Sequence, residues 1–372
     1  MKIAPFVLER YFAEHEFSAK YLLSSSDCEP LQMSDLLAMA EAETKQLWDE
    51  LRLGYTESLG HPLLREEISD IYSGIDAEKV LVLVPEEGIF LLMHALLEPG
   101  DHVVCTFPGY QSLYEVARSI GCEVSQWEPI EGENWRFDLD QLKQLLRPDT
   151  RLVIANFPHN PTGYIPPSED YLALIEIVQE RGCYLLSDEM FRFLEVVEGA
   201  TLPSGCELYE HVFSLFGLSK TFGLPGLRIG WIVTQNKEVL ARIAALKDYT
   251  TICHSAPSEI LAIIALQNRA TIFDQQLQRL QRNISVLESF FGEYDHVFRW
   301  NRPIGSSICF PRLLIEQSAD SFCAALLKDT SIMLAPSGLF QFGDQHVRVG
   351  FGREDLPQVI NRLAEYLDQY IR

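Results

Sequence analysis

The sequence of 372 residues has few basic residues and no clustered cysteines. Its 30 lysines and arginines stand against 53 aspartates and glutamates, which gives a net charge of −23. Such a charge repels phosphate backbones and anionic lipid surfaces, so we expect no nucleic-acid partner and no membrane partner. The eight cysteines lie at least 14 positions apart, with neither a Cys-x-x-Cys pair nor a histidine at metal-ligand spacing. We therefore expect free, mostly buried thiols in a reducing compartment and no metal site.

Long apolar runs are also missing. No uncharged apolar stretch approaches the ~20 residues that a membrane helix needs. The first ten residues include Lys2, Glu9 and Arg10 and lack the apolar core of a signal peptide. We expect a cytoplasmic protein without a membrane span. Neither an internal repeat nor a low-complexity tract interrupts the chain, and its composition of 47% hydrophobic and 22% charged residues is typical of globular domains.

Short β-branched runs alternate with helical-period segments between residues 79 and 234. This alternation predicts an α/β fold in which helices cover a mainly parallel sheet. The expected strands are 80–84, 102–107, 123–127, 152–155, 183–187, 212–215 and 228–234. The expected helices are 89–97, 111–120, 139–146 and 169–181.

The remainder of the chain predicts a second, smaller domain. Residues 236–292 are strongly helical, with a long segment over 258–291 that could connect two domains. Residues 297–372 predict the order strand, strand, helix, strand, strand, helix of an α+β domain. We place a large cofactor-binding domain at 46–265 and a small C-terminal domain at 266–372. The N-terminal segment 1–45 is expected to pack on the small domain or on a partner subunit.

Lys220 lies in an unusually uncharged stretch. Residues 212–227 contain no other charged side chain, and small or glycine-rich residues flank the lysine. A lysine in this setting is partly desolvated, which lowers its pKa from about 10.4 and makes the amine nucleophilic, as a Schiff-base lysine requires. A phosphate-binding P-loop is excluded, because positions 214 and 219 are serines where that motif needs glycines. A buried structural lysine paired with a carboxylate stays open as an alternative.

Asn160 and Asp188 each follow an apolar strand, at the sheet edge where ligands bind in an open α/β fold. The Asn160 amide, in the run Asn-Phe-Pro-His-Asn-Pro-Thr-Gly (156–163), can donate to a phenolate oxygen, or the dipeptide can simply form an Asn-Pro turn. Asp188 can stabilise the proton of a cationic ring nitrogen. Alternatively, it could bind magnesium together with Glu189 or cap a following helix.

Arg348 alternates with Val347 and Val349 on a short predicted strand, so its side chain points away from two apolar neighbours. A guanidinium held in this way can bind a carboxylate through two parallel hydrogen bonds. A surface salt bridge is the alternative.

Together these segments resemble the fold-type-I pyridoxal phosphate enzymes, and specifically the class I/II aminotransferase family, over nearly the whole chain. The resemblance implies pyridoxal 5′-phosphate as cofactor, with Lys220 as its Schiff-base residue and Asp188 on its pyridine nitrogen. It also implies Asn160 on the phenolic oxygen and Arg348 on the substrate α-carboxylate. The other implied contacts are phosphate binding by Arg228, by Gly88 and Ile89 at a helix start and by Tyr55 of a neighbouring subunit, and ring stacking by Tyr110.

The implied activity is transfer of an amino group from an L-amino acid to a 2-oxo acid, in a homodimer with composite active sites. We expect the substrate's variable group to be contacted from residues 10–35, from the loop 250–256 and from the partner subunit.

Two positions depart from the family pattern. Phe191 stands where a tyrosine often donates to the phenolic oxygen. Gly217 stands where a phosphate-binding serine is usual, a role that Ser219 could take. The run Tyr-Leu-Leu-Ser-Ser-Ser-Asp-Cys-Glu (21–29) is similar to the start of capreomycidine synthase-like enzymes. A pyridoxal phosphate-dependent lyase or cyclase reaction is therefore the alternative to transamination.

Overall fold

A seven-stranded sheet is the largest element of the computed structural model, which describes residues 2–370. Its strand order is β2-β8-β7-β6-β5-β3-β4, and neighbouring strands are parallel except for the two pairs that involve β8. The strands are β2 (Val80–Leu83), β3 (His102–Thr106), β4 (Glu123–Trp127), β5 (Thr150–Asn156), β6 (Tyr184–Asp188), β7 (Val212–Gly217) and β8 (Gly230–Val233). The predicted mainly parallel α/β sheet is confirmed. The predicted start of the last strand is wrong, because Arg228 precedes β8 and has a left-handed φ of 55° after the 3-10 turn Pro225–Leu227. The helix predicted over 89–97 begins earlier, at Pro85, and the strand predicted over 152–155 is longer at both ends.

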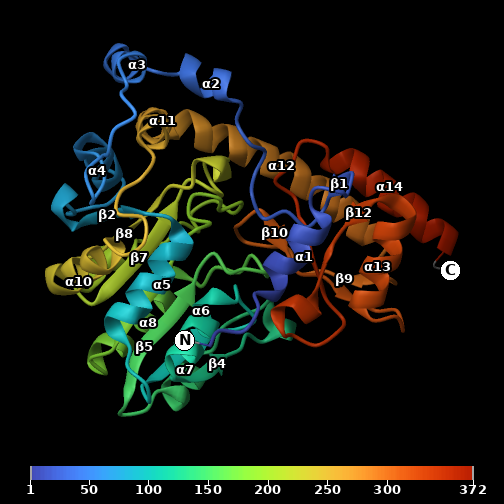
Figure 1. The fold of residues 1–372 in the computed structure, drawn as a ribbon. Coiled ribbons are helices and arrows are strands. Elements are labelled where there is room, and N and C mark those ends of the chain that lie inside the picture. Colours follow the sequence, from blue (N-terminus) through green and yellow to red (C-terminus); the bar gives the residue numbers. More distant parts are fainter. Residues whose placement is uncertain (1, 371–372) are drawn as a thin grey trace.

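Helices cover both faces of this sheet, because successive side chains of each strand point to opposite faces. On one face, Ile154 and its neighbours pack beneath α5 (Pro85–Leu96), α6 (Ser112–Ile120) and α10 (Lys237–Lys247). On the other face, Val153 and its neighbours pack on two more helices, α7 (Leu139–Leu145) and α8 (Ser168–Glu180). The β2 end of that face is covered by α4 (Pro62–Ser69) and α11 (Ala256–Gln267). Figure 1 shows these layers around the sheet.

The long helical segment expected over 258–291 is two helices rather than one. It breaks at Asn268, between α11 and α12 (Arg269–Glu293). The Asn268 side chain donates to the Ile264 carbonyl at 2.8 Å and to the Met39 carbonyl at 3.1 Å, so it competes with helical backbone bonding at this point. Asparagine is also a poor helix former, which favours the break.

The C-terminal part of the chain has a core of its own, formed by residues from 280–367 together with residues from 21–28 and 191–196. Its other helices and strands are α13 (Ala319–Thr330), α14 (Leu356–Tyr370), β9 (Phe298–Arg299), β10 (Ile308–Cys309), β11 (Arg312–Leu313), β12 (Ile332–Met333), β13 (Ala335–Pro336) and β14 (Val347–Gly350). β14 is the central strand of the three-stranded sheet β10-β14-β13. The domain limits 1–45, 46–265 and 266–372 stay a prediction.

The N-terminal segment touches both parts of the molecule (Figure 1). From α1 (Val7–His15), the Tyr11 hydroxyl donates to the Leu334 carbonyl at 2.8 Å, and the Val7 N–H donates to Gln111 Oε1 at 2.9 Å. β1 (Tyr21–Leu22) then pairs in parallel with β12. Further on, α2 (Met33–Ala38) and α3 (Ala42–Asp49) pack against α11. α1 therefore bridges the beginning of α6 and the C-terminal strands.

The eight cysteines are unpaired, as predicted, and all of them except the partly buried Cys253 are buried. Between residues 2 and 370 no helix combines the length and the apolar character needed to cross a membrane. The short helix α9 (Gly205–Leu208) completes the set of α-helices in that range.

Candidate active site

The carboxyl ends of β5 and β6 carry two polar residues that face each other. Asn156 and Asp188 end these strands and are register partners. The Asn156 amide donates to the Asp188 carbonyl at 3.0 Å, and its Oδ1 accepts from the Asn160 N–H at 2.8 Å. Asn156 thus ties the loop that carries Asn160 to the end of β6. It is not among the residues predicted for the site, although it heads the run 156–163.

The two interpretations of Asn160 are compatible. The Gly163 N–H donates to the His159 carbonyl at 2.7 Å, so the Asn-Pro segment does form a turn. At the same time Asn160 Oδ1 accepts a hydrogen bond from Arg348 Nη1 at 3.4 Å, and the residue is 7% exposed. The turn therefore presents the side chain to the interior rather than to solvent.

Asp188 is a buried carboxylate with one backbone contact. Its Oδ1 accepts from the Met190 N–H at 3.1 Å in a turn, and no α-helix begins there, so the helix-cap alternative is wrong. Glu189 instead accepts hydrogen bonds from Ser204 and from the Gly205 N–H at 3.0 Å, which leaves no shared magnesium site with Asp188. Burial raises the pKa of Asp188 to about 7, with a further increase from Glu189 and a decrease from Lys220. A cation placed beside this carboxylate would restore its charge.

Lys220 is half-buried, and its hydrogen-bond partner is a hydroxyl rather than a carboxylate. Its Nζ donates to Ser26 Oγ at 2.7 Å and lies 5.9 Å from the centre of the Phe191 ring. Burial lowers the pKa of the Lys220 amine, and the nearby charge of Arg348 lowers it further, whereas Asp27 raises it. The direction agrees with the uncharged neighbourhood seen in the sequence, and the alternative of a carboxylate-paired structural lysine is not supported.

Arg348 is a buried guanidinium with neutral partners. It is 2% exposed, so the alternative of a surface salt bridge is wrong. Nη1 donates to Asn160 Oδ1, Nη2 donates to the Ser24 carbonyl at 2.9 Å, and Nε has no partner among the described residues. The rings of Phe12 and Phe340 lie 5.6 and 5.3 Å from the guanidinium carbon. Burial lowers the pKa of Arg348 to about 10, which shows how much this cation would gain from an anionic ligand.

The segment 24–29 crosses the site between Lys220 and β14, because two glycines make room for it. A Cβ at Gly350 would lie 2.0 Å from the Ser25 carbonyl oxygen, and a Cβ at Gly352 would lie 2.8 Å from the Asp27 carbonyl oxygen. The Glu29 N–H also donates to the Gly352 carbonyl at 2.9 Å. The Gly-Phe-Gly run after Arg348 is the sequence signal for this crossing.

Tyr110 lies under α1. Its hydroxyl donates to Glu9 Oε1 at 2.9 Å, and its ring lies 4.9 Å from the ring of Phe6. Burial raises the pKa of Tyr110, and the negative charges of Glu86 and Glu9 raise it further. The hydroxyl is therefore held as a neutral donor, and the ring is fixed at the carboxyl edge of the sheet.

The N-terminus of α5 offers two free backbone donors, those of Glu86 and Glu87. Pro85 has no N–H, and the Gly88 N–H already donates to the Val84 carbonyl at 2.9 Å. Position 88 is a glycine because of packing, since a Cβ there would lie 2.6 Å from Leu83 Cδ1. The amides that are free to bind an anion are thus those one and two positions before Gly88, and the phosphate contact of Gly88 and Ile89 stays a prediction.

Arg228 and Ser219 lie on the segment after β7, close to this helix end. Arg228 is exposed, donates to the Pro225 carbonyl at 3.0 Å, and lowers the otherwise raised pKa of Glu86. Burial raises that pKa to about 7. Gly217 cannot carry the usual serine without movement, since a Cβ would lie 2.9 Å from the Gly230 Cα and 3.1 Å from Pro85 Cγ. The tight contact of β7, β8 and α5 explains this departure.

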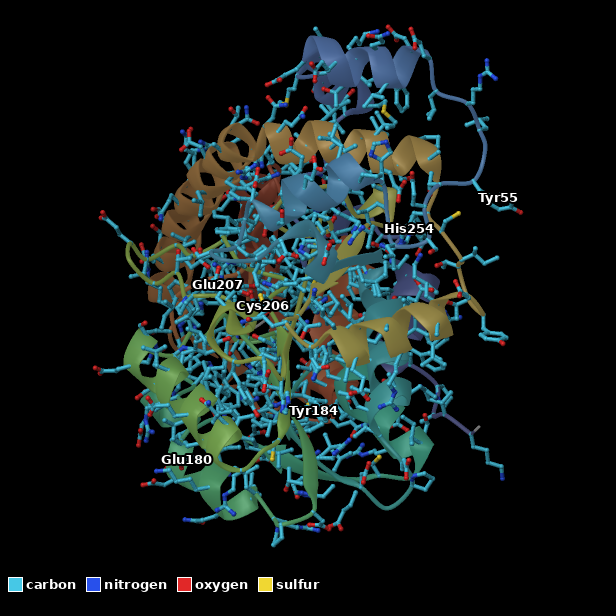
Figure 2. All side chains as sticks on the ribbon, turned by 90° about the vertical axis from the view of Figure 1, so that its left-hand side faces the viewer. Tyr55, Glu180, Tyr184, Cys206, Glu207 and His254 are labelled. Atoms are coloured by element: carbon cyan, nitrogen blue, oxygen red, sulfur yellow. The ribbon has the colours of Figure 1, made fainter. Side chains whose placement is uncertain are left out.

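Tyr55 does not join this cluster within one chain. It is 92% exposed and projects into solvent on a loop next to the one that carries His254 (Figure 2). The Thr56 hydroxyl donates to the His254 carbonyl at 3.3 Å and so ties the two loops together. Beside the α5 N-terminus, a cavity of about 530 Å³ opens between Ile3, Phe90 and Thr250, outside the Lys220 cluster.

The fold and the cluster define a class of enzyme. A mainly parallel sheet presents a lysine, an acidic acceptor, a helix N-terminus and an arginine at its carboxyl edge, and these groups suit an aldehyde, a ring nitrogen and a phosphate. The family profile described as aminotransferase class I and II matches residues 19–363, so the chain belongs to that family. It is accordingly a fold-type-I, pyridoxal 5′-phosphate-dependent enzyme of the transaminase family.

Individual relatives agree with this assignment. Capreomycidine synthase of Streptomyces vinaceus is 29% identical over 98% of this chain and 94% of its own length. An aspartate aminotransferase of Geobacillus stearothermophilus is 27% identical over 89% of this chain and 86% of its own length. The crystal structure of a pyridoxal phosphate-dependent aminotransferase from Streptococcus suis 89-1591 superposes with a TM-score of 0.93 at 30% identity and covers 100% of both chains.

Proposed function

We propose that the protein transfers an amino group from an L-amino acid to a 2-oxo acid, with Lys220 as the residue that binds the cofactor covalently. The observation that carries the proposal is the convergence of Lys220, Asp188 and Arg348. A poorly solvated amine, a buried carboxylate and a buried guanidinium with neutral partners meet around one sheet edge. Each of these groups lacks a counter-charge that a cofactor and a substrate would provide.

Pyridoxal phosphate, when bound, supplies an aldehyde that condenses with amines and a protonated ring that withdraws electrons from the substrate Cα. Asp188 would hold the proton on the ring nitrogen, and Asn160 would donate to the phenolic oxygen. Tyr110 would cover the ring. The phosphate would be held by Arg228, Ser219 and the free N–H groups of α5.

Arg348 would bind the substrate α-carboxylate through its fork of N–H donors and so orient the Cα–H bond. The Lys220 amine would act as general base and take the proton from the substrate Cα. It would then act as general acid and give a proton to the cofactor carbon that carried the aldehyde. The lowered pKa of this amine favours the neutral form that the first step needs. The Phe12 and Phe340 rings beside Arg348 keep water from the carboxylate contact.

Absorption spectroscopy of the purified protein tests this proposal. The protein should be yellow, and borohydride or the substitution Lys220→Ala should remove the absorption band. Amino donors added without a 2-oxo acid should convert the cofactor once, in stoichiometric amount. A colourless protein that does not bind pyridoxal phosphate would refute the proposal.

A lyase or cyclase reaction is the second candidate, and two observations favour it. The similarity to capreomycidine synthase extends over 98% of this chain. In addition, Phe191 faces Lys220 with a ring that has no hydroxyl. Ammonia release, or repeated turnover of an amino acid without any 2-oxo acid, would support this candidate over transamination.

The proposal includes a homodimer and a cytoplasmic location. Tyr55 is 92% exposed in its own chain, and we assign it to the phosphate site of a partner copy. Eight unpaired cysteines fit a reducing compartment.

A further inference from the structure

Helix α1 and the residue directly after it carry two carboxylates, Glu9 and Glu16. Glu9, Phe12 and Glu16 are three and four positions apart, so they share a face of the helix. The Phe12 ring lies 5.6 Å from the guanidinium carbon of Arg348, which turns this face toward the substrate carboxylate site. Glu9 accepts the hydroxyl of Tyr110, at the place proposed for the cofactor ring. α1 lies between the large sheet and the C-terminal strands (Figure 1).

Neither carboxylate is within ion-pair distance of a cation in the part of the chain that the structure describes. A third carboxylate near them, Asp27, is already paired with Arg353 at 2.9 Å. Burial raises the pKa of Glu16, and the charges of Asp27 and Glu9 raise it further, whereas Arg353 and Lys220 lower it, so Glu16 lies among charges of both signs. A cation bound beside the acidic groups would lower this pKa.

Buried polar groups on the neighbouring segments lack hydrogen-bond partners, which leaves them free to bind a ligand. Arg348, 2% exposed, has a buried Nε without a partner, and its two other contacts are neutral oxygens. Ser24 and Ser25 are 0% and 2% exposed, and neither hydroxyl has a partner among the described residues. These unpaired groups belong to the segment and the strand that α1 covers. Arg348 and Lys220 would bind the carboxylate and amino groups of an amino acid. Its side chain would then contact the surrounding segments, and α1 is one of them.

We propose that α1 contacts the substrate's side chain. Glu9 and Glu16 would select an amino donor whose side chain ends in a cationic group, either a guanidinium or an ammonium. This rests on the proposed function, because it assigns the amino and carboxylate groups of the donor to Lys220 and Arg348. An acidic donor is disfavoured, since its second carboxylate would approach Glu9 and Glu16. The preferred donor thus differs in charge from aspartate.

The carboxylates could instead serve only to balance the buried charges of Arg348 and Lys220. In that case neutralising Glu9 and Glu16 would lower kcat/KM for all amino donors equally, whatever the side chain. A pair of donors that match in shape and differ in charge separates these two roles. L-Arginine and L-citrulline are such a pair, because a neutral urea group replaces the guanidinium.

The experiment compares the loaded wild-type enzyme with Glu9→Gln, Glu16→Gln and the double variant. Glu14→Gln is the matched control, since the Glu14 side chain on the same helix is 75% exposed and its ion pair is with the neighbouring His15. The rate of the spectral change gives kcat and KM for arginine, lysine, citrulline and aspartate. Calorimetry with 5-guanidinopentanoate and 5-ureidopentanoate, which lack the α-amino group, measures side-chain recognition without reaction.

We expect wild-type enzyme and Glu14→Gln to prefer arginine over citrulline by about 10²-fold in kcat/KM, mainly through KM. Each single variant should reduce that preference about tenfold, and the double variant should bring it close to 1. Thermal melting checks that the variants are folded. A wild-type preference near 1, or a preference that the double variant keeps, would overturn the inference. Failure of every amino acid to change the spectrum would refute the proposed function instead, and calorimetry would still decide whether the guanidinium is preferred.

Discussion

The Arg348 guanidinium donates to the Asn160 side-chain oxygen at 3.4 Å and so joins β14 to the loop after β5. The two residues are 188 positions apart, and both are almost fully buried. Through this contact, the group proposed to bind the substrate carboxylate and the group proposed to bind the cofactor's phenolic oxygen hold each other in place. The proposed substrate and cofactor sites therefore share this hydrogen bond.

Arg348→Lys keeps the charge and removes the planar fork of donors. We expect kcat/KM for amino donors to fall about 10²-fold, mostly through KM, because one bidentate carboxylate contact is lost. The absorption spectrum of the loaded protein should not change. Arg312→Lys is the control, since the Arg312 side chain is 41% exposed and pairs with Glu131. An equal loss in both variants would contradict the role of Arg348.

Asp188→Asn should change the pH dependence of stability in the cofactor-free protein. The pKa of Asp188 is about 7 in the folded chain and near 3.8 when unfolded, so the folded state holds its proton longer. Stability then falls as pH rises from about 4 to about 7, by on the order of 4 kcal/mol from this residue. The asparagine variant should lose that contribution and melt higher than wild type at pH 8.

With the cofactor bound, wild type should melt higher than the asparagine variant at pH 8, because a cationic ring nitrogen would pair with the ionised carboxylate. The asparagine variant should then bind the cofactor more weakly and lose at least about 10²-fold in activity. Calorimetric melting of both forms at pH 5 and pH 8 checks this. Identical pH profiles for wild type and variant without cofactor would show that Asp188 ionises normally.

Gly217→Ser restores the residue usual in the family but should not improve phosphate binding. Its Cβ would lie 2.9 Å from the Gly230 Cα, so we expect a loss of about 1–3 kcal/mol in the free energy of unfolding. Ser219→Ala, by contrast, should leave stability unchanged within about 0.5 kcal/mol and raise the Kd for pyridoxal phosphate. Urea unfolding and equilibrium dialysis measure the two effects. Tighter cofactor binding by Gly217→Ser would contradict the packing argument.

Phe191→Tyr adds a hydroxyl to a buried ring near Lys220. The new donor would stabilise the anionic form of the cofactor's phenolic oxygen, so the pKa of the absorbing group formed with Lys220 should fall. A spectral pH titration of the loaded protein measures this shift. Phe193→Tyr is a suitable control, because Phe193 stacks on Phe273, away from Lys220. If the pKa of the absorbing group is the same in Phe191→Tyr and wild type, position 191 does not affect protonation at the site.

Mixing two variants, each with a defect in a different part of the site, tests whether the site is composite. Lys220→Ala lacks the amine, and Tyr55→Phe lacks the hydroxyl proposed to reach the partner's phosphate site. In a mixed dimer one site carries both defects and the other carries neither. Equal amounts should therefore restore about a quarter of the wild-type sites if subunits exchange freely. Sedimentation should show a dimer of the 42.4 kDa chain, and absence of recovery in a confirmed mixed dimer would place Tyr55 in its own subunit.

The local features of this protein were predictable from the order of its residues. Strand periodicity depends on neighbours two positions apart, so the seven strands and their mainly parallel arrangement could be read directly. The uncharged stretch around Lys220 likewise predicted the direction of its pKa shift, because the stretch has no carboxylate adjacent in the chain to hold the amine protonated. The break at Asn268 was missed, since an apolar segment with one asparagine does not by itself show which tertiary contacts favour a helix end.

The partners of the site residues were decided only by tertiary structure. Ser26 reaches Lys220, Glu9 reaches Tyr110, and the Ser24 carbonyl reaches Arg348, each from more than 100 positions away. Such contacts depend on how α1 and the segment after it cross the molecule, and that crossing requires the missing side chains of Gly350 and Gly352. The sequence by itself therefore determined which groups could react. The packing of distant segments decided which charges remained unpaired around them, because electrostatic interactions depend on distance in space and on burial rather than on separation along the chain.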